Sequence, residues 1–158
     1  MDKLYDYPVK WQKPDKFHLT IRFLGDLYEN TINELIKQLE FIDFGFKLIE
    51  MYTSGIGFFP DEKYPNVVFI DLKETANNSE VLITAIDSIL NRLGIKPDKK
   101  FVPHITVGRF RRENRIRLKE NINIEVEKIQ IIFGSFYLMK SRLTPKGSIF
   151  SVIKKFPF

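Results

Sequence analysis

The stretch FHLTIRFLGD at residues 17–26 decides the fold, because its apolar and polar residues alternate strictly. A period of two predicts a β-strand with one buried face, ended by Gly25 and Asp26. His18 and Thr20 then share the opposite face, about 6.5 Å apart along the strand, and look into solvent or a cleft. The apolar side comprises Phe17, Leu19, Ile21 and Phe23.

A second stretch, FVPHITVGRF at residues 101–110, repeats this pattern. His104 and Thr106 again stand two apart, with Ile105 and Val107 on the buried side. The chain contains only two histidines, and each is followed at the second position by threonine. A single histidine on a strand is usually a surface residue, but two in the same context, in the two halves of the chain, indicate one shared site.

The elements around the two motifs form an approximate internal repeat. A helix is expected from Thr31, because Thr31 and Glu34 form a capping box that opens a helical apolar pattern. A second helix is expected over 79–93, with Gly94 as its stop. The turn-rich segment SGIGFFPDEKYP separates two of the predicted strands. The further strands are expected at 45–53, 66–73, 129–143 and 148–158.

This order predicts an α+β protein built as a duplicated bilobal unit. Two antiparallel sheets would line a central cleft, with helices on the outside. The 158 residues are expected to form a single domain with two pseudo-symmetric lobes.

Composition indicates a cytoplasmic globular protein, since 44% of the residues are hydrophobic, no apolar run could span a membrane and cysteine is absent. The N-terminus has no secretory signal. The net charge of +5 favours a polyanionic partner, with a solvated basic surface as the alternative. The densest basic cluster comprises Arg109, Arg111, Arg112, Arg115 and Arg117.

Two imidazoles in one cleft suit acid–base chemistry on a phosphorus centre. The pKa of imidazole lies ordinarily near 6.5, so one ring can accept a proton while the other donates one. The hydroxyls of Thr20 and Thr106 can donate hydrogen bonds to phosphate oxygens. A metal site lacks further ligands, and a Ser or Thr nucleophile would leave the second histidine without a role. No metal or cofactor is therefore expected.

The chain resembles the two-histidine (2H) phosphoesterase superfamily, and within it the RNA 2′,3′-cyclic phosphodiesterases, also called 2′-5′ RNA ligases. The matching segments are Trp11, HLTIRFLGD at 18–26, GFFPDEKYPNVVFIDL at 57–72, FVPHITVGRF at 101–110 and LMKSRLTPKGSIFSVI at 138–153.

The resemblance implies metal-independent hydrolysis of RNA 2′,3′-cyclic phosphate ends to 2′-phosphomonoesters, with a reversible 2′-5′ ligation. By motif position His18 would donate a proton to the departing 3′ oxygen, and His104 would activate water. Arg22 and Arg109 are candidate substrate-binding residues. Strict alternation places Arg109 opposite His104, and only a bulge at Gly108 would turn it toward the phosphate.

The sequence departs from the family pattern in two places. The resemblance predicts that the family's N-terminal strand and helix are missing here, either because the chain is shortened or starts internally, or through a loss that would leave an open sheet edge. We expect a monomer, with a dimer as the alternative if that edge pairs with a second copy. Asn66 and Phe69 stand where the family has Arg and Trp.

Other interpretations of the same motifs stay open at this point. One is a nucleotide- or RNA-end-binding module with weak catalysis. Another is a 2H enzyme for a different cyclic phosphate or for 2′-5′ oligonucleotides.

Overall fold

A computed structural model describes residues 4, 7–97, 100–111, 117–118, 124–145 and 147–158. The chain forms two compact units, each assembled from three separate segments. Unit 1 comprises Met1–Ile21, Met51–Lys73 and Phe101–Ile131, and unit 2 comprises Arg22–Glu50, Glu74–Lys100 and Ile132–Phe158. The predicted α+β class with two antiparallel sheets is confirmed.

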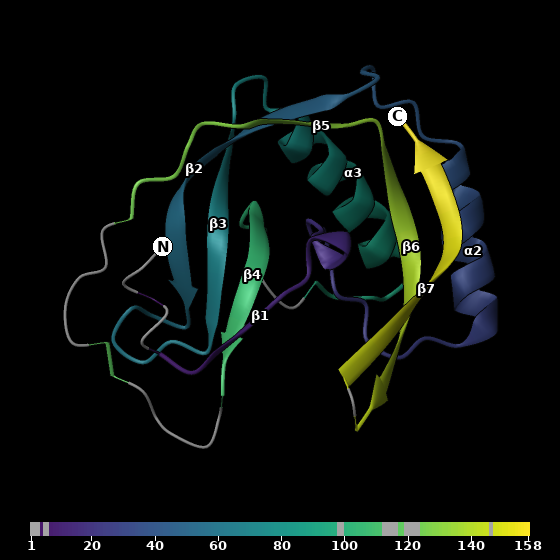
Figure 1. Ribbon diagram of the computed structural model, residues 1–158. Coiled ribbons are helices and arrows are strands. Elements are labelled where there is room, and N and C mark those ends of the chain that lie inside the picture. The colour runs from purple at the N-terminus through teal and green to yellow at the C-terminus, as the bar shows by residue number, and fades with distance from the viewer. Residues whose placement is uncertain (1–3, 5–6, 98–99, 112–116, 119–123, 146) are drawn as a thin grey trace. The chain divides into compact units, whose positions relative to one another are not determined.

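Unit 1 is organised by a five-stranded sheet in the order β1-β4-β3-β2-β5. Figure 1 shows β2, β3 and β4 side by side, with the short β1 along the edge of β4. The strands are β1 (Val9–Trp11), β2 (Ile49–Phe59), β3 (Val67–Glu74), β4 (His104–Phe110) and β5 (Gln130–Phe133).

One face of this sheet carries the core of unit 1. Val68 of β3 and Phe110 of β4 are buried there together with Leu4 and Leu118. Val9 packs against this cluster from β1. Thr106 and His104 of β4 pair with Phe69 and Asp71 of β3, which alternate with Val68, so these motif residues lie on the other face.

The predicted strand over 17–24 was wrong, because this segment makes only a single antiparallel bridge, between Leu19 and Ile105. A short 3₁₀ helix, η1 (Pro14–Lys16), precedes it. Proline at the first position of η1 has a preset φ and no N–H, which favours a helical turn over a continued ladder. After the bridge, Arg22 already belongs to unit 2.

Strand β2 is longer than predicted, since it runs through both glycines of the segment that the sequence predicted as a turn. The reason lies at Gly57, where an added Cβ would overlap the ring of Phe69 on β3. A glycine inside a strand often marks such a close approach, and local sequence alone does not distinguish it from a turn glycine.

Unit 2 contains the helices α2 (Glu29–Glu40) and α3 (Asn78–Arg92), and a ribbon of β6 (Ser135–Thr144) and β7 (Gly147–Pro157). Figure 1 shows this ribbon as a long hairpin with α2 alongside β7. Leu35 and Leu39 form the buried stripe of α2, and Phe136 and Phe156 stack across the ribbon at 4.9 Å.

The ends of the helices test two sequence predictions. The capping box was wrong, because α2 begins at Glu29 after Tyr28, so Thr31 already lies inside the first turn. Gly94 is the stop of α3, as predicted, with φ +73.

No helix in the described part of the chain is both long and apolar enough for a membrane span.

Candidate active site

The two His-x-Thr segments lie next to each other in unit 1. Leu19 bridges Ile105, and Ile105 is in turn paired with Ile70 of β3. Partners across neighbouring strands share a face of the sheet, so these three apolar residues point to one side. The residues on either side of Leu19 and Ile105 therefore point to the other side together.

This register brings the four motif residues into one group. In an antiparallel pair centred on the bridge, His18 lies opposite Thr106, and Thr20 lies opposite His104. The two histidines thus occupy diagonal positions, which are roughly 7–8 Å apart on neighbouring strands. Such a spacing leaves room for one phosphate group between the rings.

Each imidazole ring is oriented by a hydrogen bond of the same type, between its Nδ1 atom and a backbone carbonyl oxygen. The Nδ1 atom of His18 lies 2.7 Å from the carbonyl oxygen of Lys16, and Nδ1 of His104 lies 2.7 Å from that of Val102. A carbonyl oxygen only accepts, so each Nδ1 carries a proton and donates it. The Nε2 atom is then the nitrogen of each ring that can take up or release a proton.

A β-bulge in β4 decides where the arginine of the second motif lies. The register of β3 against β4 shifts between Val68 and Phe69, which leaves Val107 of β4 as the extra residue. Beyond it Arg109 pairs with Val67. Val67 and Phe69 share a face of β3, and Phe69 is the partner of the motif threonine. The sequence required a bulge at Gly108, and the structure has it at the neighbouring Val107. Arg109 therefore lies on the same face as His104 and Thr106.

Two phenylalanines hold the ring of His104. The rings of Phe59 and Phe69 stack on each other at 4.2 Å, and each meets the imidazole edge at a centroid distance of 5.0 Å. Phe69 is buried and lies over Gly57. These contacts and the hydrogen bond of Nδ1 to the Val102 carbonyl oxygen together restrict the orientation of the imidazole.

A model of the LigT-like phosphoesterases matches residues 1–69 and 70–150. The chain belongs to the LigT-like phosphoesterase family. This membership confirms the resemblance and the prediction of an enzyme of the phosphoesterase class.

Relatives with assigned names agree with this family. A Methanocaldococcus jannaschii protein is 33% identical over 154 residues, covering 93% of this chain and 83% of its own. An Aquifex aeolicus protein is 33% identical over 153 residues, covering 93% and 80%. Each is named RNA 2′,3′-cyclic phosphodiesterase.

Two solved structures share the fold. A Thermus thermophilus protein superposes with a TM-score of 0.74 at 25% identity, over 99% of this chain and 86% of that one. Escherichia coli LigT, solved in complex with 3′-AMP, superposes with a TM-score of 0.76 at 18% identity, over 95% and 81%. The second match shows the fold alone.

Arg22 forms an ion pair within unit 2. Its guanidinium donates two hydrogen bonds of 2.7 Å to the carboxylate of Asp87 on α3, within unit 2. The side chain of Arg22 is 8% exposed, so this pair is largely removed from water. The structure thus gives Arg22 a stabilising role beside α3, and its binding of substrate stays a prediction.

The phosphoesterase site contains residues that the sequence did not point to. Gly57 and Phe59 belong to the segment that was predicted as a turn, and Phe69 was noted only as a departure from the family pattern. The alternation of β3 could have placed Phe69 beside the second motif, but only the pairing with β4 shows it.

The basic cluster lies only partly within the described residues. Arg109, Arg111 and Arg117 of the cluster are exposed, whereas Arg112 and Arg115 lie outside the described residues. The described residues contain no group of three or more His, Asp or Glu that could hold a metal ion.

Proposed function

We propose that this phosphoesterase hydrolyses 2′,3′-cyclic phosphate ends of RNA to 2′-phosphomonoesters without a metal ion. The observation that carries the proposal is the bridge between Leu19 and Ile105, which sets the two His-x-Thr pairs diagonally on one face. The names of the relatives from Methanocaldococcus jannaschii and Aquifex aeolicus support the substrate class.

The diagonal placement of the histidines suits an in-line displacement at phosphorus. Nε2 of His104 takes a proton from water as the water oxygen attacks. The bond between phosphorus and the 3′ oxygen breaks, and Nε2 of His18 gives its proton to that oxygen. The products are a 2′-phosphomonoester and a free 3′-hydroxyl, and each proton transfer contributes roughly 10² to 10⁴ in rate.

The threonines stand where the charge of the transition state develops. By the register of the Leu19–Ile105 bridge, Thr20 and Thr106 each lie opposite a histidine, on either side of the proposed phosphate position. Their hydroxyls donate hydrogen bonds to the two non-bridging oxygens and stabilise the negative charge there. Arg109, one position further along the same face, adds a positive charge.

The same site can also join two RNA ends when the 5′-hydroxyl of a second RNA takes the place of water. His104 accepts the proton of this hydroxyl as its oxygen attacks phosphorus. The 3′ oxygen leaves with the proton of His18, and the phosphate then links the two RNAs through a 2′-5′ bond. The reverse of this step cleaves the linkage and restores the cyclic phosphate.

The product of hydrolysis tests the proposal. Incubation of the protein with an RNA oligonucleotide that ends in a 2′,3′-cyclic phosphate is expected to yield a 2′-phosphate and no 3′-phosphate, identified by chromatography against standards. A 3′-phosphate product would contradict the roles of His18 and His104. Binding of the 2′-phosphate product without any turnover would identify a binding module.

A further inference from the structure

Two positively charged side chains stand directly opposite each other beside the motif residues. Lys10 of β1 pairs with Arg109 of β4 across the antiparallel ladder. Cross-strand partners share a face, so Lys10 lies on the His-x-Thr face together with Arg109. Like charges in directly opposed positions destabilise a sheet, and such a pair therefore points to a function.

No acidic side chain in the described part of the chain forms an ion pair with either residue, and both are exposed. The carboxylate that β3 presents on this face belongs to Asp71, the partner of His104. Asp71 lies four residues along β3 from Val67, the partner of Arg109. Two adjacent cations with no acidic partner attract an anion, and a phosphodiester can accept hydrogen bonds from both.

The position of the pair relative to the site defines which anion it would bind. The partners of Arg109 and Thr106 on β3, Val67 and Phe69, are two residues apart, which is about 6.5 Å along a strand. Lys10, the partner of Arg109 on β1, lies beside these residues on the same face. An RNA chain that has its terminal cyclic phosphate between the histidines would bring its next phosphate toward these cations.

We propose that Lys10, together with Arg109, binds the phosphodiester that joins the cyclic-phosphate nucleotide to the nucleotide before it. This inference rests on the proposed function and deepens it. The site then distinguishes RNA ends from free cyclic mononucleotides, because only an RNA end carries that second phosphate.

Kinetics on two matched substrates test this proposal. The dinucleotide ApC with a 2′,3′-cyclic phosphate is compared with cytidine 2′,3′-cyclic phosphate, which lacks the internal phosphodiester. The native enzyme is expected to prefer the dinucleotide in kcat/KM. Lys10→Gln is expected to reduce this preference about tenfold, as for loss of one charge-assisted hydrogen bond. Lys10→Arg, which keeps the charge, is expected to retain most of it.

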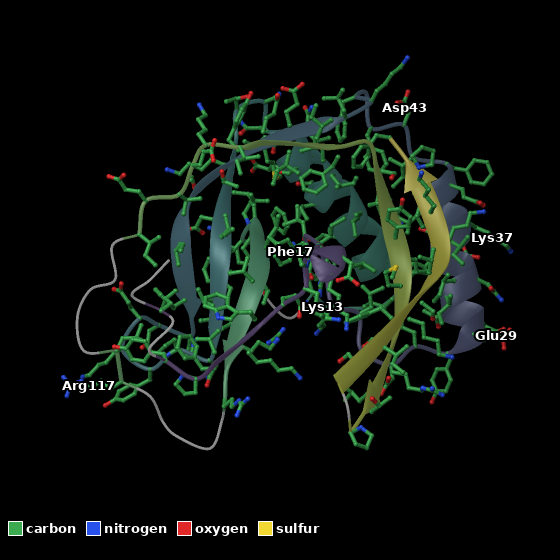
Figure 2. All side chains as sticks on the ribbon, viewed as in Figure 1. Lys13, Phe17, Glu29, Lys37, Asp43 and Arg117 are labelled. Atoms are coloured by element: carbon green, nitrogen blue, oxygen red, sulfur yellow. The ribbon has the colours of Figure 1, made fainter. Side chains whose placement is uncertain are left out.

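Lys37 offers a matched control. It is an exposed lysine of α2, and Figure 2 shows it on the side of α2 away from β7. Lys37→Gln removes the same net charge from unit 2, so it is expected to leave the preference unchanged. If Lys37→Gln reduced the preference as much as Lys10→Gln, or if Lys10→Gln kept the native preference, the phosphodiester site would be rejected.

A binding measurement separates this proposal from the proposed function. Calorimetric titration compares ApC bearing a 2′-phosphate with cytidine 2′-monophosphate on the native protein and on Lys10→Gln. Absence of turnover on both cyclic substrates would overturn the proposed function alone, because the titration would still report the second phosphate. Equal affinities of the two ligands for the native protein would overturn the site at Lys10.

Discussion

At the scale of single residues, the two histidines have the same local geometry and different proposed roles. Each ring donates its Nδ1 proton to a carbonyl oxygen two residues earlier. His18→Ala and His104→Ala are each expected to reduce kcat by roughly 10² to 10⁴, as for removal of a general acid or base. Single-turnover kinetics on a cyclic-phosphate RNA measure the loss, and an unchanged circular dichroism spectrum serves as control. A variant with near-native kcat would remove that histidine from the mechanism.

The pH profile separates the two roles. The proposed mechanism needs one charged and one neutral ring, so kcat/KM is expected to fall on both sides of an optimum. In the proposed mechanism, protonation of the acceptor His104 stops the reaction on the acid side, and loss of the proton of the donor His18 stops it on the alkaline side. In His18→Ala the alkaline decline is expected to disappear from the residual rate, while the acid decline stays. Loss of the acid decline instead would exchange the two assignments.

Arg22 and Asp87 form a pair whose contribution to stability can be measured directly. Arg22→Gln and Asp87→Asn are each expected to lower the free energy of unfolding by roughly 1.5–3 kcal/mol, because each leaves a partly buried charged group without its partner. The double variant is expected to lose much less than both effects together, since the two side chains share one interaction. Urea denaturation of the three variants gives the coupling. Full additivity would show that the pair contributes nothing.

At the scale of elements, strands β2 and β3 support the histidine of β4. Gly57→Ala is expected to destabilise the protein by roughly 1–3 kcal/mol, because its methyl group would overlap the ring of Phe69, which also contacts His104. The matched control is Gly55→Ala on the same strand, where an added Cβ meets nothing within 4 Å. Urea denaturation compares the two variants. Equal stabilities would show that the Phe69 ring moves aside without cost.

At the scale of the whole molecule, each half of the chain contributes segments to both units, and both histidines fall in unit 1. All four motif residues therefore belong to one sheet and its neighbouring segment. The proposed chemistry uses only their side chains and water, so extensive dialysis against EDTA is expected to leave kcat unchanged. The assay compares the dialysed enzyme with aliquots to which divalent cations are returned. A loss that added metal restores would replace the two-histidine mechanism with a metal-assisted one.

Local patterns predicted much of the fold. The apolar periodicity of α3, its glycine stop and the alternation around His104 depend on residues close together in the chain, and the structure agrees with each. The prediction at 17–24 failed in two ways, because alternation alone does not show that a segment joins a ladder, and because Phe17 and Phe23 of the predicted buried side are exposed. Only Leu19 joins the ladder, since η1 interrupts the pairing before it.

By itself, the amino-acid sequence determined the α+β class and the two His-x-Thr motifs that the candidate site contains. The tertiary structure decided three features that local pattern does not encode: the diagonal register of the motifs, the bulge at Val107 that turns Arg109 onto their face, and the partner of Arg22. The physical reason is that register and bulges are properties of pairs of strands. They depend on which distant residues pair and pack together, and the sequence of a single segment does not specify its partner.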